Sequence, residues 1–169
     1  NTYSGGTIVS GGTLVGNTAS LQGRFLINAR MLFAQLSSGR FNGVPSGTGN
    51  VVKQGAGLLL LTGDQPFSGT VDVEQGTLQV GDSSTPSSLG GQVKVANGAA
   101  LSGNGSVGSI NNNGLVVSGA NARVLRVAGN LTNAPTGVLA LTVTSPTVTP
   151  LAVGGAATLG GGLVVNNLL

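Results

Sequence analysis

One phrase of this chain occurs twice, 64 residues apart. Residues 1–17 read NTYSGGTIVSGGTLVGN, and residues 64–82 read DQPFSGTVDVEQGTLQVGD. Gly12-Thr13-Leu14 of the first copy matches Gly76-Thr77-Leu78 of the second. A short unit of strand and glycine cannot bury its apolar face alone, so repeated units of this kind stack on one another. The repeat therefore favours a solenoid.

Short runs of alternating apolar and polar residues recur along the chain. In Thr70–Glu74 the valines face one side and the two acids face the other. The same alternation recurs at Leu78/Val80, Val93/Val95, Leu115/Val117, Leu125/Val127, Leu139/Leu141, Leu151/Val153 and Leu163/Val165. The spacing also fits a sandwich or a barrel, but the self-similar phrases and the glycine corners favour a parallel β-helix. We expect about seven coils of roughly 20–25 residues, stacked into a rod about 35 Å long.

Residues 24–36 fit two kinds of secondary structure. Apolar residues at helical spacing form one possible stripe: Phe25, Ala29, Leu32, Phe33 and Leu36. Phe25 with Ile27, and Met31 with Phe33, also alternate as two strands. We expect strands, because every neighbouring segment is strand-like.

The leucine run at 58–61 also allows two interpretations. Leu59 and Leu61 are expected to point inward, and Leu58 and Leu60 outward. The outer pair is either covered by a loop, which we favour, or exposed as an adhesive face for a partner.

Composition excludes several classes of function. With 31 glycines, 40% hydrophobic residues and 7% charged residues, the chain is too apolar for a disordered linker. It has no Cys and no His, so thiol nucleophiles, disulfides and imidazole bases are impossible within it. Its seven basic residues are scattered and aromatic residues are few, which argues against nucleic acid as a partner. No apolar run is long enough for a membrane-spanning helix.

Two motifs suggest chemistry but have simpler explanations. Asp72 and Glu74 share a strand face, as do the calcium-holding acids of some β-helical polysaccharide lyases, yet no third acid lies nearby in sequence. Gly103–Gly108 matches G-x-G-x-x-G, but a strand-like segment follows it and no acid occurs after Asp82. We interpret these motifs as solvent-facing charge and as a corner. The sequence predicts no catalytic, cofactor-binding or metal-binding residue.

Asparagines cluster at the expected corners, where stacked side chains can hydrogen-bond between coils. They are Asn97, Asn104, Asn111, Asn112, Asn113, Asn130 and Asn133. We expect a structural role for them.

Several phrases together resemble the passenger domains of autotransporters, the type V secreted proteins of Gram-negative bacteria. They are Asn1–Thr7, Gly11–Gly16, Ser46–Lys53, Gly55-Ala56-Gly57 followed by Leu59, Leu61, Thr62 and Gly63, then Gly98–Gly105 and Gly129–Thr132. The resemblance implies a right-handed parallel β-helix, located at the bacterial cell surface or secreted. It also implies a partner, a C-terminal outer-membrane β-barrel of the same polypeptide, which this sequence does not contain. Residue 1 lies within a phrase, so we expect a fragment.

The resemblance extends to the organisation of the chain. Residues 1–97 are expected to form passenger coils, and residues 98–169 to form C-terminal coils and a cap that resemble the autochaperone region, all within one continuous domain. That region would fold first and cap the rod with a β-hairpin. The candidate cap residues are Leu151, Val153, Leu159, Leu163 and Val165.

The expected function is non-enzymatic: a structural stalk that assists the folding and secretion of a surface autotransporter. The alternative is an adhesin segment that binds a host surface or associates with itself. A polysaccharide-degrading enzyme is disfavoured, because acids, aromatics and His are scarce or absent. We expect no cofactor.

Overall fold

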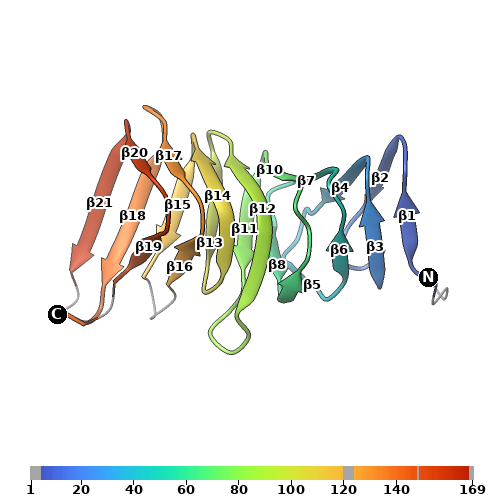
Figure 1. Ribbon diagram of the computed structural model, residues 1–169, viewed down its shortest axis with the longest axis horizontal. Helices are drawn as coiled ribbons and strands as arrows, with labels where there is room; N and C mark the ends of the chain where they lie inside the picture. Colours follow the sequence, from blue (N-terminus) through green and yellow to red (C-terminus); the bar gives the residue numbers. More distant parts are fainter. Residues whose placement is uncertain (1–4, 120–123, 148, 168–169) are drawn as a thin grey trace.

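A computed structural model describes residues 5–119, 124–147 and 149–167 of the chain. The described residues form an all-β rod in which successive coils stack from the N-terminal end to the C-terminal end (Figure 1). Within these ranges no helix is long and apolar enough to cross a bilayer.

Each coil contributes strands to three faces of the rod, and about eight coils stack along it. The first face contains β1 (Thr7–Val9), β3 (Arg24–Ile27), β6 (Val44–Ser46), β9 (Gly63–Gln65), the first parts of β12 (Ser87–Val95) and β14 (Ser106–Asn112), β16 (Leu125–Val127) and β19 (Leu151–Val153). The second face contains β2 (Thr13–Gly16), β4 (Arg30–Ala34), β7 (Asn50–Gln54), β10 (Thr70–Val73), the last parts of β12 and β14, β17 (Leu131–Asn133) and β20 (Ala157–Leu159). The third face contains β5 (Gly39–Phe41), β8 (Leu58–Leu61), β11 (Gly76–Val80), β13 (Ala99–Gly103), β15 (Leu115–Ser118), β18 (Val138–Val143) and β21 (Gly162–Asn167).

All the strand pairings in the described residues are parallel, and they join each coil to the next. Paired residues lie 20 apart where Asn50 pairs with Thr70, but 15 apart at Ala100 and Leu115 and 26 apart at Leu125 and Leu151. The predicted parallel β-solenoid is therefore confirmed. The variable coil length is absorbed mainly at the corners, and between β12 and β14 also by a register shift between Leu89 and Gln92.

The core is a continuous column of side chains inside the coils. Alternate residues of each strand point inward, as in β10, where Val71 and Val73 are buried. All four phenylalanines are buried in the N-terminal half. The ring of Phe41 lies 4.9 Å from that of Phe33, edge to face, and 5.9 Å from that of Phe25. After Ala99, the buried hydrophobic residues of the core are all valine, leucine or isoleucine.

The two copies of the repeated phrase do not stack directly on one another. In the first copy Thr7–Val9 lies on the first face and Thr13–Gly16 on the second. In the second copy Thr70–Val73 lies on the second face and Gly76–Val80 on the third. Both copies point the same positions inward, so Val9 and Val73 are both buried. The phrase specifies two strands and the corner between them, and it leaves the choice of face open.

Both stretches that allowed two interpretations form strands. Residues 24–36 form β3 and β4, with four inward side chains buried, so the strand interpretation is confirmed and the helical stripe is wrong. In β8, Leu59 and Leu61 are buried, while Leu58 and Leu60 are partly covered. The row that contains Leu60 continues to Arg40 on one side and Gln79 on the other. Arg40 reaches past this coil to form an ion pair with Asp82.

The C-terminal end differs from the expected hairpin. Strands β19, β20 and β21 each pair in parallel with the preceding coil, through β16, β17 and β18. The segment is therefore one more coil of the spiral. Its glycine pairs lie at the corners of that coil and not at the tip of a hairpin. Of the candidate cap residues, Leu151 and Val153 pack against the core, while Leu159, Leu163 and Val165 are exposed. Their capping role, the handedness of the spiral and the boundary at residue 97 remain predictions.

Candidate binding groove on the lateral face

The two acids singled out in the sequence lie on the outer side of the second face, and both have partners. Asp72 accepts a hydrogen bond from the Asn50 side chain at 2.8 Å and lies 3.9 Å from the Lys94 ammonium. Glu74 accepts one from the Gln54 side chain at 2.6 Å and lies 3.8 Å from the Arg30 guanidinium. Within the described ranges no group of three potential metal ligands occurs. The acids link neighbouring coils.

The G-x-G-x-x-G segment is a corner between β13 and β14. Gly103 has a φ of 140°, and a Cβ there would lie 2.1 Å from the carbonyl oxygen of Val80 in the previous coil. A Cβ on Gly105 would lie 2.3 Å from the carbonyl oxygen of Ser87. These glycines let two coils approach closely, which accounts for the motif without a nucleotide.

A lysine inside the core is a feature that sequence reasoning missed. Lys53 lies at an inward position of β7 and is fully buried. Its ammonium donates to the carbonyl oxygens of Gly55 at 2.6 Å, Gln75 at 2.9 Å and Gln54 at 3.3 Å. Burial lowers the pKa of Lys53 below its usual value of 10.5. The side chain joins the corners of two successive coils. Its alternation with Val51 was the signal that could have placed it inside.

An asparagine pair has a similar role nearer the C-terminal end. Asn112 and Asn133 are buried at matching positions of successive coils, and Asn112 donates to the Asn133 side-chain oxygen at 2.7 Å. Asn112 also accepts from the Gly114 N–H, and Asn133 donates to the Gly137 carbonyl, both at 3.1 Å. The expected structural role of corner asparagines is thus confirmed for this pair.

A loop between β11 and β12 is organised by one carboxylate. Asp82 accepts hydrogen bonds from the Ser84 hydroxyl at 2.8 Å and from the N–H groups of Ser84 and Thr85 at 2.9 and 2.7 Å. These bonds, led by the Ser84 hydroxyl and helped by the Arg40 guanidinium, lower the pKa of Asp82 to about 2. The carboxylate is therefore ionised at neutral pH.

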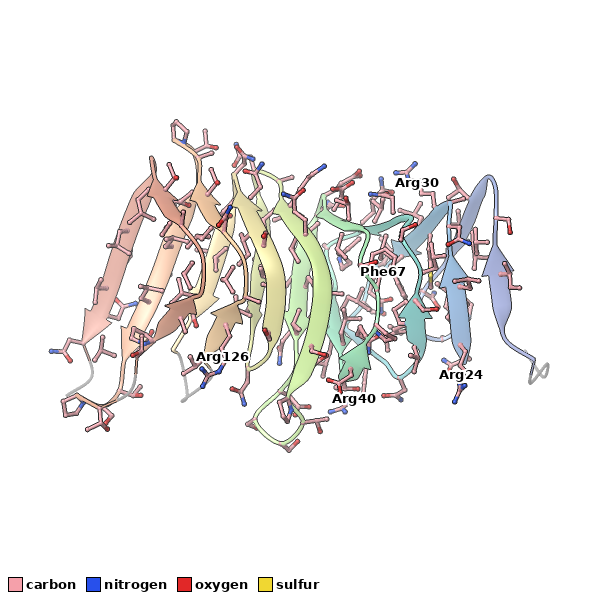
Figure 2. All side chains as sticks on the ribbon, viewed as in Figure 1. Arg24, Arg30, Arg40, Phe67 and Arg126 are labelled. Carbon is pink, nitrogen blue, oxygen red and sulfur yellow. The ribbon has the colours of Figure 1, made fainter. Side chains whose placement is uncertain are left out.

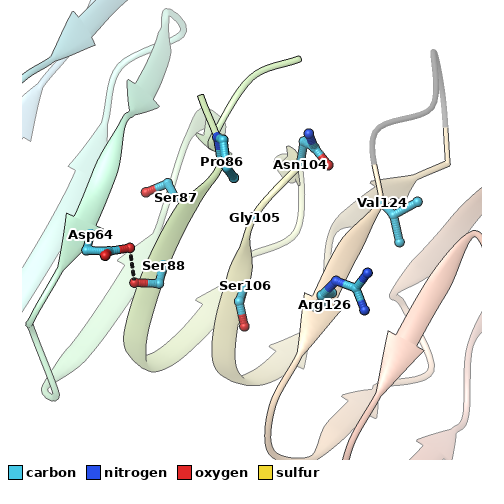
Figure 3. Close-up of a pocket in the computed structure, with 9 residues that line it drawn as sticks. All are labelled: Asp64, Pro86, Ser87, Ser88, Asn104, Gly105, Ser106, Val124 and Arg126. Atoms are coloured by element: carbon cyan, nitrogen blue, oxygen red, sulfur yellow. Dashed lines mark hydrogen bonds between the residues drawn. The ribbon is translucent and has the colours of Figure 1, made fainter. Parts of the chain in front are cut away.

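Beside this loop, a groove of about 490 Å³ runs along the first face (Figure 3). Its floor is a row of matched residues, one from each of four successive coils. They are Asp64 on β9, Ser88 on β12, Ser106 on β14 and Arg126 on β16. Pro86, Asn104 and Val124 line the groove along the adjacent corner. With strands about 4.8 Å apart, the row is about 14 Å long.

The two ends of the groove carry opposite charge. At one end the Ser88 hydroxyl donates to Asp64 at 2.7 Å. At the other end Arg126 is exposed, and in the described residues it has no carboxylate partner, because the three ion pairs there use Arg30, Arg40 and Lys94. Its guanidinium extends beyond Ser106, away from Asp64 (Figure 3). A polar, uncharged floor thus separates a carboxylate from a guanidinium.

Two segments of the chain match a known family of repeats. Residues 1–15 and 51–80 match the family described as Passenger-associated-transport-repeat. The second match covers β7 to β11 and includes Lys53 and the corners that it joins. The chain therefore carries the repeat of autotransporter passengers on a parallel β-helix, as the sequence phrases predicted.

Two curated relatives share this sequence pattern. The chain is 36% identical over 102 residues to the "Adhesin BmaC autotransporter" of Brucella suis biovar 1 (strain 1330), a match that covers 60% of this chain and 3% of that protein. It is 36% identical over 91 residues to the "Uncharacterized protein YuaQ" of Escherichia coli (strain K12), covering 52% of this chain and 7% of that protein. The chain thus spans a small fraction of either relative. No solved structure matches it.

Proposed function

We propose that the chain is a structural stalk segment of a surface autotransporter, and that it supports the folding and secretion of the passenger. The observation that carries the proposal is the parallel stacking of coils along the rod: in the described residues, the second and third faces pair continuously from coil to coil, and the first face is interrupted only between β6 and β9. A coil that is already folded offers paired edges and an apolar end to the next one, so folding can propagate along the rod. A translocator domain of the same polypeptide would hold this rod at the surface of a Gram-negative cell.

The folding role makes a directional prediction that is tested in the whole passenger. Leu125 and Leu78 are both completely buried in the core, one in the region proposed to fold first and one in the other half. Each is replaced by Asp in the parent protein, which is expressed in a Gram-negative host. Surface display is measured by protease accessibility on intact cells.

If residues 98–169 start folding, Leu125→Asp removes almost all displayed passenger, whereas Leu78→Asp leaves the C-terminal coils displayed. The exposed residue Ile8 gives the control, since Ile8→Asp should change nothing. Equal loss of display in both buried variants would reject the directional role.

Adhesion is a second candidate, favoured by the relative that is named an adhesin. The stalk would then carry its own binding surface for a host structure or for another copy of the chain. Sedimentation over a range of concentrations tests self-association, and a concentration-independent sedimentation coefficient argues against it. A polysaccharide-degrading activity is not part of the proposal, and a reducing-sugar assay with added calcium checks that expectation.

A further inference from the structure

We infer that the groove on the first face binds a short oligosaccharide that carries one acidic group, with its carboxylate at Arg126 and its neutral sugars toward Asp64. This deepens the adhesive form of the proposed function, because it names the surface and the chemical class of ligand.

The charge distribution of the chain points to an anion at the Arg126 end. All four acidic residues precede position 83, while Lys94, Arg123 and Arg126 follow it. Each of the acids has a hydrogen-bonding side chain close by, and Lys94 faces Asp72. Arg126 is thus a described cation without a carboxylate of its own. A guanidinium binds carboxylates through two parallel hydrogen bonds.

The floor of the groove suits a hydroxyl-bearing ligand. The Ser106 hydroxyl has no hydrogen-bond partner among the described residues. The Asn104 amide donates to the Asp82 carbonyl at 3.2 Å, which leaves its side-chain oxygen as an acceptor. Asp64 has acceptor capacity beyond its bond to Ser88. The groove thus offers acceptors at Asp64 and Asn104, a hydroxyl at Ser106 and donors at Arg126, which can bond the hydroxyls of a sugar chain.

Other ligand classes fit this surface less well. An extended peptide binds a sheet by pairing with a free edge strand. Three of the four strands under the groove are interior, since β12 pairs with β9 and β14, β14 with β16, and β16 with β19. The fourth, β9, pairs with β12 alone, but β6 lies beside its other edge. Among the described residues that line the groove none is aromatic, and Pro86 and Val124 are the largest apolar ones, so they offer little to a lipid or a peptide side chain.

Asp64 makes the site selective for ligands with a single charge. A polyanion that spans the row of about 14 Å would bring negative charge to Asp64, where like charges repel. A ligand with one terminal carboxylate and neutral sugars places its charge at Arg126 alone. This arrangement fixes the direction in which the ligand lies.

The test uses the full chain and three probes: 3′-sialyllactose with one carboxylate, neutral lactose, and a heparin tetrasaccharide with many charges. Titration calorimetry gives the affinities, and circular dichroism checks folding of every variant. We expect sialyllactose to bind best, with an affinity that falls as salt rises. Arg126→Gln should weaken sialyllactose binding at least about tenfold, since a hydrogen bond to a charged group is lost. Asp64→Asn should strengthen binding of the heparin fragment.

Arg24→Gln is the matched control, because Arg24 is also exposed but lies near the opposite end of the rod (Figure 2). It should leave all three affinities unchanged. Sialyllactose binding that survives Arg126→Gln, or equal affinity for lactose, overturns the inference. Binding of phosphatidylserine vesicles or of an acidic peptide through Arg126, without binding of the sugar, also overturns it. Unchanged surface display of the Arg126→Gln parent protein would show that failure of this site leaves the stalk function intact.

Discussion

The buried lysine allows the folding energetics of the repeat to be tested at a single side chain. Replacing Lys53 by Met keeps an unbranched chain of similar length in the core but removes the donor. The Gln54 carbonyl still accepts the Gln35 N–H at 2.9 Å. The carbonyls of Gly55 and Gln75, which receive the two shorter bonds from Lys53, lose their donor. The substitution therefore leaves one buried acceptor, the Gly55 carbonyl, unsatisfied, and removes the donor from the Gln75 carbonyl, which belongs to an exposed residue.

An unsatisfied buried acceptor costs about 1–3 kcal/mol, which applies to the Gly55 carbonyl, and the more exposed Gln75 carbonyl adds a smaller loss. Removing the ammonium also relieves its own desolvation, which offsets part of that cost. We expect Lys53→Met to lower the free energy of unfolding by about 2 kcal/mol. Urea denaturation followed by circular dichroism measures it. Lys94→Met is the control, since the Lys94 side chain is half exposed and its surface ion pair contributes at most about 1 kcal/mol.

Lys53 should also make the stability of the wild-type protein depend on pH in a way that Lys53→Met does not share. Because the folded state lowers the pKa of Lys53, the folded protein binds fewer protons than the unfolded chain between that lowered pKa and 10.5. Stability of the wild-type protein should therefore rise with pH in this window, and Lys53→Met should remove this rise. A variant at least as stable as the wild type at pH 7 would refute the proposed role of the lysine at the corner.

Three further substitutions probe other contacts between coils. Asn133→Ala should lower the free energy of unfolding by about 2 kcal/mol, because Asn112 loses its side-chain acceptor in the core; thermal denaturation measures this. Gly103→Ala should cost about 3 kcal/mol in the same assay, since the new methyl would collide with the Val80 carbonyl. Wild-type stability should fall as pH drops from the ordinary Asp value near 3.8 through about 2, and Asp82→Asn should flatten that acid limb of a pH titration. If any of the three variants has the same stability and pH dependence as the wild type, the corresponding contact does not stabilise the fold.

The strands were largely predictable because their inward residues alternate with polar ones. Thr70–Val73 shows this alternation, and its two valines are buried as expected. The C-terminal segment was misjudged as a hairpin, since short apolar runs separated by Gly-Gly look alike in a hairpin and in a coil. The partner and direction of each strand distinguish them: β21 pairs in parallel with β18 of the preceding coil, whereas the strands of a hairpin pair antiparallel with each other.

The groove could not be predicted from sequence for a related reason. Its floor joins Asp64, Ser88, Ser106 and Arg126, which are separated by unequal intervals along the chain. Coil lengths vary at the corners, so counting residues does not reveal which side chains share a row. Lys53 was missed because its charge suggested an outward position, although its spacing from Val51 indicated the interior.

The placement of the repeated phrase on different faces has a consequence for how such rods can grow. A segment that supplies two strands and a bend can occupy any two consecutive sides of the spiral, as the copies at 7–16 and 70–80 do. Duplication of such a segment does not have to add a whole number of turns to keep apolar side chains inside. The length of the rod is therefore adjustable in steps smaller than one turn.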